Sequence, residues 1–174
     1  MGIQFETDYN METLTAMAKG LRKTVRKKRS RRVHIFAAVV LILGLLTILA
    51  TTAGGEPPGA SGVVTLLALL VVILATVFED RLNAWFAKKR LLPGTEHAVA
   101  TFEEDGYVSA TSMSESKFSY AQIVAVAETA RYFVFALSSH HTQAYDKRTI
   151  RGGSVEDFRA FIAEKTGKLV ENIK

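Results

Sequence analysis

Two long apolar stretches dominate the pattern of hydrophobic and polar positions along the chain. Residues 33–53 contain no acidic residue, and residues 60–78 contain no charged residue at all. At about 1.5 Å per residue, helices over these ranges are roughly 28–31 Å long, which matches a hydrocarbon core of about 30 Å. The loop between them, residues 54–59, contains glycine and proline and is short enough to force the helices antiparallel. The pattern predicts a membrane protein anchored by an α-helical transmembrane hairpin.

Two other kinds of apolar segment fit this pattern less well. A secretory signal peptide needs its apolar region near the N-terminus, followed by a cleavage site. Here the first stretch begins only at residue 33, and the second follows it closely. Two buried core helices without charge would need a large protein around them, and the chain has 174 residues. Two membrane spans are therefore expected.

Basic residues gather on the flanks of the predicted hairpin. Residues 19–32 contain nine Lys or Arg and no acidic residue, whereas the loop offers only Glu56. Arg81 and the basic run at residues 88–90 follow the second stretch. Flanks rich in Lys and Arg stay on the cytoplasmic side of a membrane. We therefore expect a two-span protein of a bacterial plasma membrane, with both termini in the cytoplasm and an extracytoplasmic loop.

From residue 95 onward the pattern changes to a period of two, which is typical of strands. Asp105-Gly106 is a strong hairpin signal. Ser154 with Asp157 predicts the start of a helix that Gly167 ends. Residues 95–174 are therefore expected to form a small cytoplasmic α+β domain, an antiparallel sheet or barrel closed by a C-terminal helix, which resembles a pleckstrin-homology-like (PH-like) split barrel. The expected strands are residues 97–103, 107–111, 117–120, 123–128, 132–137 and 143–147.

Shorter segments flank the two spans. Within residues 1–32, alternation over residues 2–8 predicts a strand, and Asn10 caps a basic amphipathic helix that runs into the first span. Residues 79–94 are expected to form a juxtamembrane helix and a linker. Because residues 2–8 lie on the same side of the membrane as the soluble domain, we expect this strand to join its sheet.

Beyond these patterns, the chain resembles the YcxB-like family of bacterial membrane proteins. Two positions depart from the family's pattern: Asp146 stands where proline is usual, and Ile150 replaces an aromatic residue. The resemblance implies the same order of parts along nearly the whole chain, and it implies no catalytic residue. It is carried by Phe118-Ser119-Tyr120-Ala121-Gln122-Ile123, by Glu128-Thr129 ahead of Tyr132-Phe133-Val134-Phe135, by Lys147-Arg148 and by Asp157-Phe158.

The sequence offers no constellation that predicts catalysis. The chain has no cysteine, which excludes disulfides and thiolate chemistry. Neither span carries a carboxylate or a Lys or Arg that would mark an ion path. His140 and His141 point to opposite faces of an extended chain with only Asp146 nearby, so a polar turn is preferred over a metal site. The acidic run at residues 103–105 is interpreted as a solvated turn. We expect a protein that is not an enzyme and binds no cofactor.

Positive charge near the spans offers contacts for anionic lipid headgroups, each contributing about 1 kcal/mol near an anionic surface. The simpler interpretation is that this charge only fixes the topology. In a PH-like barrel, basic loops at one rim can also hold anions, or they are solvated strand ends. Trp85 and Phe86 follow the second span, where an aromatic belt is expected. The candidate anion or lipid contacts are Arg26, Lys27, Lys28, Arg29, Arg31, Arg32, Lys88, Lys89, Arg90, Lys147 and Arg148.

We favour a non-catalytic, membrane-anchored interaction module whose PH-like domain binds a protein partner, or an anionic headgroup, at the inner membrane face. Two alternatives stay open, an accessory or immunity-type subunit of a toxin or transport system and, more weakly, a membrane enzyme or transporter. The net charge of +5 is concentrated beside the first span, so no nucleic-acid partner is expected. The small residues Ala37, Gly44 and Ala53 leave homo-oligomerisation open.

Overall fold

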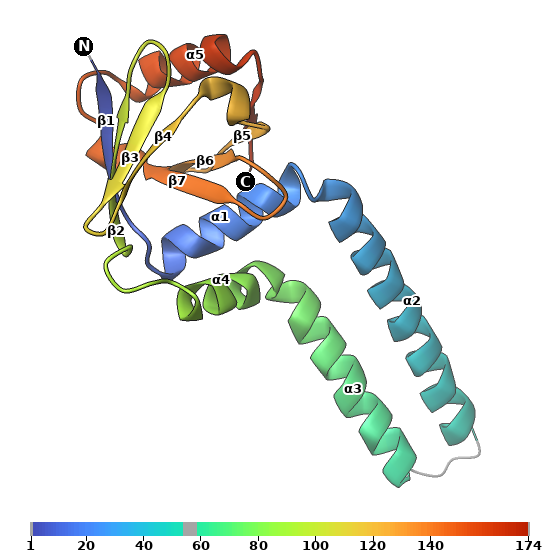
Figure 1. Cartoon of the computed structure of the whole chain (residues 1–174). Coiled ribbons are helices and arrows are strands. Elements are labelled where there is room, and N and C mark those ends of the chain that lie inside the picture. The colour runs from blue at the N-terminus through green and yellow to red at the C-terminus, as the bar shows by residue number, and fades with distance from the viewer. Residues whose placement is uncertain (1, 54–58, 174) are drawn as a thin grey trace.

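The structure of the chain, a computed structural model, describes residues 2–53 and 59–173 (Figure 1). All of the predicted loop at residues 54–59 except Gly59 lies outside the described residues. The elements in chain order are β1 (Ile3–Asp8), α1 (Met11–Lys23), α2 (Lys27–Thr52), α3 (Ala60–Val77), α4 (Glu79–Lys89), β2 (His97–Phe102), β3 (Tyr107–Thr111), β4 (Glu115–Phe118), β5 (Ala125–Glu128), β6 (Tyr132–Ala136), β7 (Thr142–Asp146), α5 (Val155–Thr166) and β8 (Val170–Asn172).

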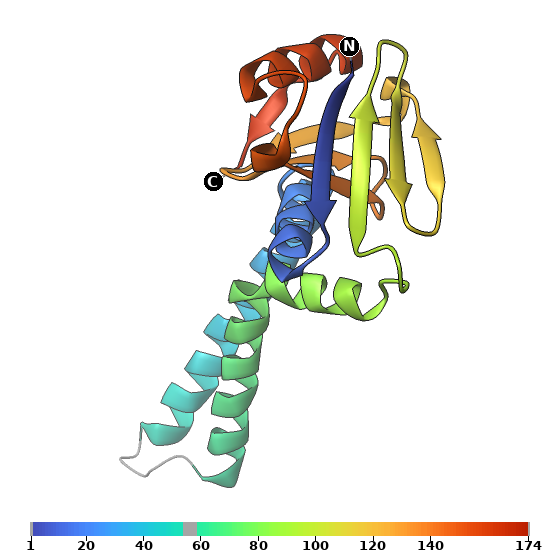
Figure 2. The same ribbon diagram turned by 90° about the vertical axis from the view of Figure 1, so that its left-hand side faces the viewer.

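The helices α2 and α3 form an antiparallel hairpin that projects from the rest of the molecule (Figures 1 and 2). They have 26 and 18 residues, or about 39 Å and 27 Å at the rise of an α-helix. Gly44 allows a close approach, because a Cβ there would lie 2.6 Å from Cδ2 of Leu69. Only 6% of the apolar window of each helix is buried inside the molecule. The predicted pair of helices long and apolar enough to cross a membrane is therefore confirmed.

The strands form two four-stranded sheets. The first has the order β1-β2-β3-β4 and is antiparallel, and the second has the order β7-β6-β5-β8 with β8 parallel to β5. The expected α+β domain is confirmed, but its sheets do not close into a barrel. The strands β4 and β7, which are one outer strand of each sheet, are not paired with each other. Side chains meet there instead: the rings of Phe118 and His141 lie 6.3 Å apart.

The strand β1 belongs to the first sheet although the helical hairpin separates it from β2 in the sequence. It pairs with β2 from Ile3 opposite Phe102 to Asp8 opposite His97, and Phe5 is fully buried. The prediction that residues 2–8 join the sheet is therefore confirmed. Because β1 precedes the hairpin and β2 follows it, their pairing places both strands on one side of any membrane that the hairpin crosses.

Aromatic side chains fill the space between the sheets at the end that α5 covers. The predicted cap of α5 is confirmed, because Ser154 Oγ accepts a hydrogen bond of 3.0 Å from the Asp157 backbone N–H, and Gly167 ends the helix with φ 64°. Phe158 and Ile162 of α5 are fully buried. The aromatic core comprises Phe5, Phe102, Tyr107, Tyr120, Phe133, Phe135, Tyr145 and Phe158.

At the opposite end, α1 and α4 lie side by side beneath the second sheet (Figure 1). The predicted cap of α1 is present, since Asn10 Oδ1 accepts from the backbone of Glu12 and Thr13. The apolar face of α1 packs on β6, where a Cβ at Gly20 would lie 2.7 Å from Cγ1 of Val134. This face is therefore used for packing within the domain.

Two sequence predictions differ from the structure, and one strand was not predicted. The basic helix does not run on into the first span, because the chain bends between α1 and α2, where Arg26 donates a 2.6 Å hydrogen bond to the Ser139 carbonyl oxygen. β4 ends at Phe118, because Ser119 and Gln122 form a capping box around a 3-10 turn. β8 was not predicted, because three residues are too few to show a strand period.

Candidate membrane-proximal binding site

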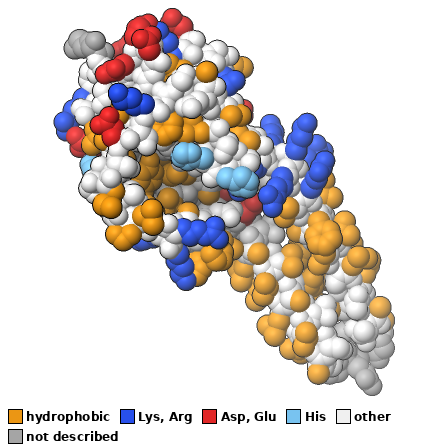
Figure 3. Space-filling view, viewed as in Figure 1, with side chains coloured by type: hydrophobic (Ala, Val, Ile, Leu, Met, Phe, Trp, Pro, Cys, Tyr) orange, Lys and Arg blue, Asp and Glu red, His pale blue; other side chains and the backbone are white. Residues whose placement is uncertain are grey.

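The space between the two sheets is open at the end nearest the helical hairpin. A cavity of about 500 Å³, here called the intersheet groove, is bounded by the inner face of the first sheet, by the start of β7 and by α1 and the end of α4. The space-filling view shows hydrophobic side chains around this groove and histidine side chains at its rim (Figure 3). Its lining includes Tyr9, Leu14, Met17, Leu91, Leu92, Ala98, Ser109, Thr111, Ser114, Ser116, Phe118, His141, Thr142 and Gln143.

Small residues on the first sheet leave the groove unfilled. Across the sheet, Ala100 stands opposite Ser109, and Ser109 stands opposite Ser116. One step nearer the hairpin, Ala98 stands opposite Thr111. Side chains on one face of a strand recur every second residue, so these residues share a face with the aromatic core and are simply too small to continue it.

A polar layer separates the groove from the aromatic core. Gln143 Oε1 accepts hydrogen bonds of 2.7 Å from the hydroxyl groups of both Tyr107 and Tyr145. Burial raises the pKa of both phenols, so that each stays a neutral donor. On the side of the aromatic core, the groove is therefore bounded by uncharged polar groups that are hydrogen-bonded to one another.

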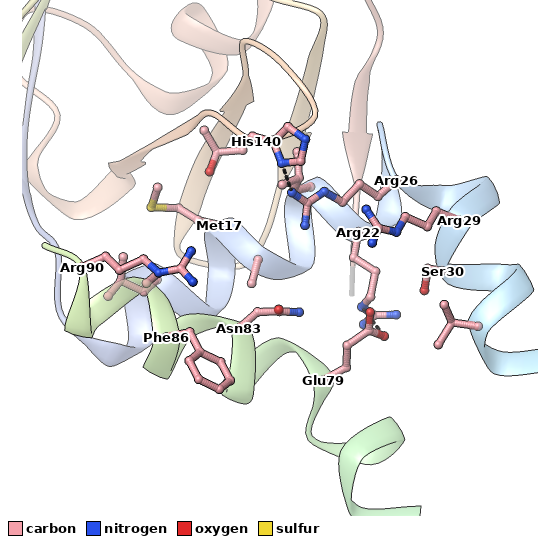
Figure 4. Close-up of a pocket in the computed structure, with 16 residues that line it drawn as sticks. Met17, Arg22, Arg26, Arg29, Ser30, Glu79, Asn83, Phe86, Arg90 and His140 are labelled. Atoms are coloured by element: carbon pink, nitrogen blue, oxygen red, sulfur yellow. Dashed lines mark hydrogen bonds and ion pairs between the residues drawn. The ribbon is translucent and has the colours of Figure 1, made fainter. Parts of the chain in front are cut away.

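A second cavity, here called the junction hollow, lies where the domain meets the helical hairpin. It has a volume of about 530 Å³ and is lined by α1, by the starts of α2 and α4, by the end of α4 and by the β6–β7 turn (Figure 4). Leu14, Met17, Ala87, Arg90 and Thr142 line both cavities. The two cavities are therefore neighbours along the base of the domain.

Two arginines of the junction hollow are engaged in contacts within the chain. Arg22 of α1 forms a two-pronged pair with Asp80 of α4, with Nε–Oδ1 and Nη2–Oδ2 distances of 2.7 and 2.6 Å. The hydrogen bonds to Asp80 raise the pKa of Arg22. Arg26 reaches the β6–β7 turn, where Nη2 lies 2.9 Å from His140 Nδ1. The first pair joins α1 to the start of α4, and the second joins the start of α2 to the β6–β7 turn. Both helices of the hairpin are therefore held against the domain.

Two further arginines point into the hollow from opposite ends (Figure 4). Arg29 belongs to the first turn of α2, and Arg90 is the C-terminal cap of α4. Within the described part of the chain, neither guanidinium forms an ion pair. Glu79 also lines the hollow, and its Oε2 is buried without a hydrogen bond among the described residues, with Arg22 Nε and His34 Nε2 each 3.8 Å away. The hollow thus combines unpaired positive charge with one unsatisfied acceptor.

The predicted interface anchors lie on α4, which turns away from α3 and runs across the base of the domain (Figure 2). Ala84 is fully buried, whereas Trp85 and Phe86 are 45% and 51% exposed with ring centroids 4.9 Å apart. Lys89 Nζ lies 3.6 Å from the centre of the Trp85 ring. One face of α4 therefore packs on the domain while an aromatic and basic face stays uncovered.

The other predicted contacts separate into three groups. Arg26, Arg29 and Arg90 line the junction hollow, whereas Lys147 and Arg148 are engaged in ion pairs elsewhere on the domain. Lys147 Nζ lies 2.9 Å from Glu128 Oε1, and Arg148 Nη2 lies 2.9 Å from Asp146 Oδ2. The residues Lys27, Lys28, Arg31, Arg32 and Lys88 are exposed on α2 and α4 and do not line the hollow.

Sequence reasoning missed Arg22, Glu79, Asp80 and His140 as members of one site. The acidic pair at residues 79–80, which begins α4 immediately after an uncharged span, was the available signal. Its partner lies 58 residues away in the sequence, and only the fold brings the two together. Among the described residues there is also no group of three or more His, Cys, Asp or Glu that could hold a metal ion.

The fold and these cavities define an α+β domain into which a long apolar helical hairpin is inserted between the first two strands. The model of the YcxB-like protein family matches residues 102–162, a segment that runs from the end of β2 into α5. The resemblance drawn from the sequence is therefore confirmed over this segment. Comparisons with curated proteins and with solved structures gave no match.

Proposed function

We propose that the chain is a non-catalytic, membrane-anchored interaction module. In this proposal, α2 and α3 cross a bacterial plasma membrane, both termini lie in the cytoplasm, and the two-sheet domain binds a protein partner at the inner membrane face. The basic residues that flank the hairpin support the cytoplasmic placement, because such flanks are retained on that side. The outward-facing Leu, Ile and Val side chains of α2 and α3 support insertion in lipid.

One observation carries the proposal: the anchor is inserted within the domain and is not attached at its end. The sheet strand β1 precedes the hairpin and its partner β2 follows it. The Arg22–Asp80 pair and the Arg26 contacts hold the two helices against the domain. A domain on a flexible tether samples many orientations, whereas this arrangement presents one fixed face to the membrane and the intersheet groove just above it.

The intersheet groove supports a protein as the partner. It lies between β4 and β7, one outer strand of each sheet, so backbone N–H and C=O groups of β4 have no strand partner on one side among the described residues. Peptide segments bind such edges by adding a strand, with alternate side chains entering an adjacent groove. Apart from Arg90, His141 and Gln143, the side chains that line this groove carry hydroxyl groups or are apolar, which suits a largely neutral peptide segment.

The test uses a photo-crosslinking amino acid placed in the full-length protein in living cells. Replacement of Ser116 puts the probe on the groove wall, and replacement of Lys117 puts it on the opposite face of the same strand. We expect one discrete protein adduct from position 116 and none, or much less, from position 117. Equal labelling from both positions, or no adduct from either, would contradict a partner in the groove.

The membrane placement has a separate test. A reporter that is active only in the cytoplasm is fused to the C-terminus, and a second one that is active only outside is fused at the same position. Activity of the cytoplasmic reporter alone is expected. Activity of the external reporter, or purification of the chain as a monodisperse species without detergent, would overturn the anchored module.

A further inference from the structure

The junction hollow lies at the level where the apolar helices enter the domain. Val33, the first residue of the uncharged part of α2, lines it together with Phe86 of α4. The hollow is about 530 Å³ in volume, which is enough for a ligand much larger than a water molecule. If the hairpin is inserted as proposed above, the hollow faces the headgroup layer of the inner leaflet.

The charges of the side chains that line the junction hollow favour the binding of an anion. Arg22 and Arg26 have partners within the chain, which leaves Arg29 and Arg90 pointing into the space from opposite ends (Figure 4). A guanidinium group donates paired hydrogen bonds to phosphate oxygens, and two of them can hold one phosphate between them. Arg29 and Arg90 are exposed and belong to different helices, so only the folded protein brings both of them to the junction hollow.

Two further features favour a lipid over a free anion. The hollow has apolar walls beside its arginines, formed by Leu14, Leu21 and Val33. These walls suit the glycerol and the first acyl carbons of a phospholipid. Glu79 Oε2 is buried and has no hydrogen bond among the described residues, although Arg22 Nε and His34 Nε2 each lie 3.8 Å away. A ligand hydroxyl group could supply the hydrogen bond that these longer contacts do not make. A headgroup that carries both a phosphate and a hydroxyl group satisfies the arginines and Glu79 together.

We infer that the junction hollow is a binding site for an anionic glycerophospholipid with a hydroxyl-bearing headgroup, whose phosphate lies between Arg29 and Arg90. This inference rests on the proposed membrane placement. It extends the proposed function, since a bound lipid would fill the space between hairpin and domain and fix the height of the intersheet groove above the membrane.

The test measures lipids retained by the full-length protein purified in detergent, by native mass spectrometry during titration with phosphatidylglycerol or phosphatidylcholine. The hollow variant carries Arg29→Gln and Arg90→Gln. Its matched control carries Arg31→Gln and Lys88→Gln, which remove the same charge from the same two helices outside the hollow. We expect one tightly bound phosphatidylglycerol on the wild type and the control. Affinity of the hollow variant should fall by at least about tenfold, because charge-assisted hydrogen bonds are lost.

Three outcomes would overturn the inference: an equal loss of lipid in both variants, equal retention of the two lipids by the wild type, or saturation of the site by inorganic phosphate with no lipid preference. Arg29→Lys with Arg90→Lys keeps the charge and should restore part of the binding, and the near-ultraviolet circular dichroism of all variants should match the wild type. If the reporter fusions confirm the topology while the variants bind lipid equally, the inference fails and the anchored module stands.

Discussion

The two ends of the space between the sheets differ in what fills them. At the end beneath α5, the aromatic core closes the space, and the Phe5 and Phe158 rings lie 4.6 Å apart. At the end above the hairpin, the same faces carry alanine, serine and threonine and leave the intersheet groove. Because the face is continuous and only residue size changes, the stability of the domain resides at the first end and space for a ligand at the second.

The largest expected effect comes from the filled end. Phe5→Ala removes a fully buried ring that contacts Phe102, Tyr145 and Phe158. Truncation of a buried Phe costs about 3–5 kcal/mol of unfolding free energy. Thermal unfolding in detergent, followed by near-ultraviolet circular dichroism, should show a large fall in the midpoint.

The control for this change is Phe86→Ala, which removes a ring of the same size from the exposed face of α4. It should leave the unfolding midpoint nearly unchanged. If Phe5→Ala also left the midpoint unchanged, β1 would not belong to the domain core, and the insertion of the anchor within the domain would be wrong.

A smaller effect is expected where α1 packs on the second sheet and forms a wall of both cavities. A Cβ at Gly20 would meet Val134 at 2.7 Å, so Gly20→Val overpacks the contact between α1 and β6. Overpacking of this kind costs about 1–3 kcal/mol. Gly59→Val is the control, because a Cβ there has no atom within 4 Å among the described residues. Equal melting midpoints for the two variants would show that α1 does not rest on β6.

A third effect depends on pH and lies outside both cavities. The buried Glu128 carboxylate accepts hydrogen bonds from Arg159 and Lys147, and these lower its pKa despite its burial. A lowered pKa in the folded state means that stability is present above the ordinary value of 4.5 and is lost as the pH falls below it. Glu128→Gln should lower stability at neutral pH by about 1 kcal/mol, because the half-exposed Arg159 is partly screened by solvent.

The measurement is the unfolding midpoint of wild type and Glu128→Gln at a series of pH values from about 6 down to about 3, the range in which carboxylates titrate. The two curves should converge at the acid end, since the wild-type carboxylate is then protonated. If the two curves stayed parallel, other carboxylates would be responsible for the loss of stability in acid.

Much of this fold could be predicted from the sequence, because the signals are local. The two apolar stretches, the Asp105-Gly106 hairpin and the Ser154 cap depend only on near neighbours along the chain. The split into two sheets could not be predicted, because it depends on whether β4 and β7 pair across a long sequence separation. The short strand β8 likewise gains its stability from β5 and not from its own pattern.

For the candidate site, the sequence identified basic residues but not their grouping. Arg29 and Arg31 are equivalent as basic residues of one flank, but they lie about 200° apart around α2, so only Arg29 lines the junction hollow. Lys147 was predicted as an anion contact because basic loops at the rim of a PH-like barrel can hold anions, yet its side chain is 14% exposed and bonded to Glu128. Charge in a sequence gives the number of candidates, whereas packing decides which remain available to a ligand.

The smallest change in stability is expected for a substitution at the open end, on the wall of the intersheet groove. The same substitution should have a large effect on partner binding. Ser109→Val introduces a strand-favouring side chain on the groove wall, where space is available, and Ala110→Val makes a similar change on the opposite face of β3. Both should alter the unfolding free energy by no more than about 0.5 kcal/mol. Only Ser109→Val narrows the groove, so it alone should reduce the adduct from the probe at position 116. An equal reduction by both variants would mean that the partner does not enter the space between the sheets.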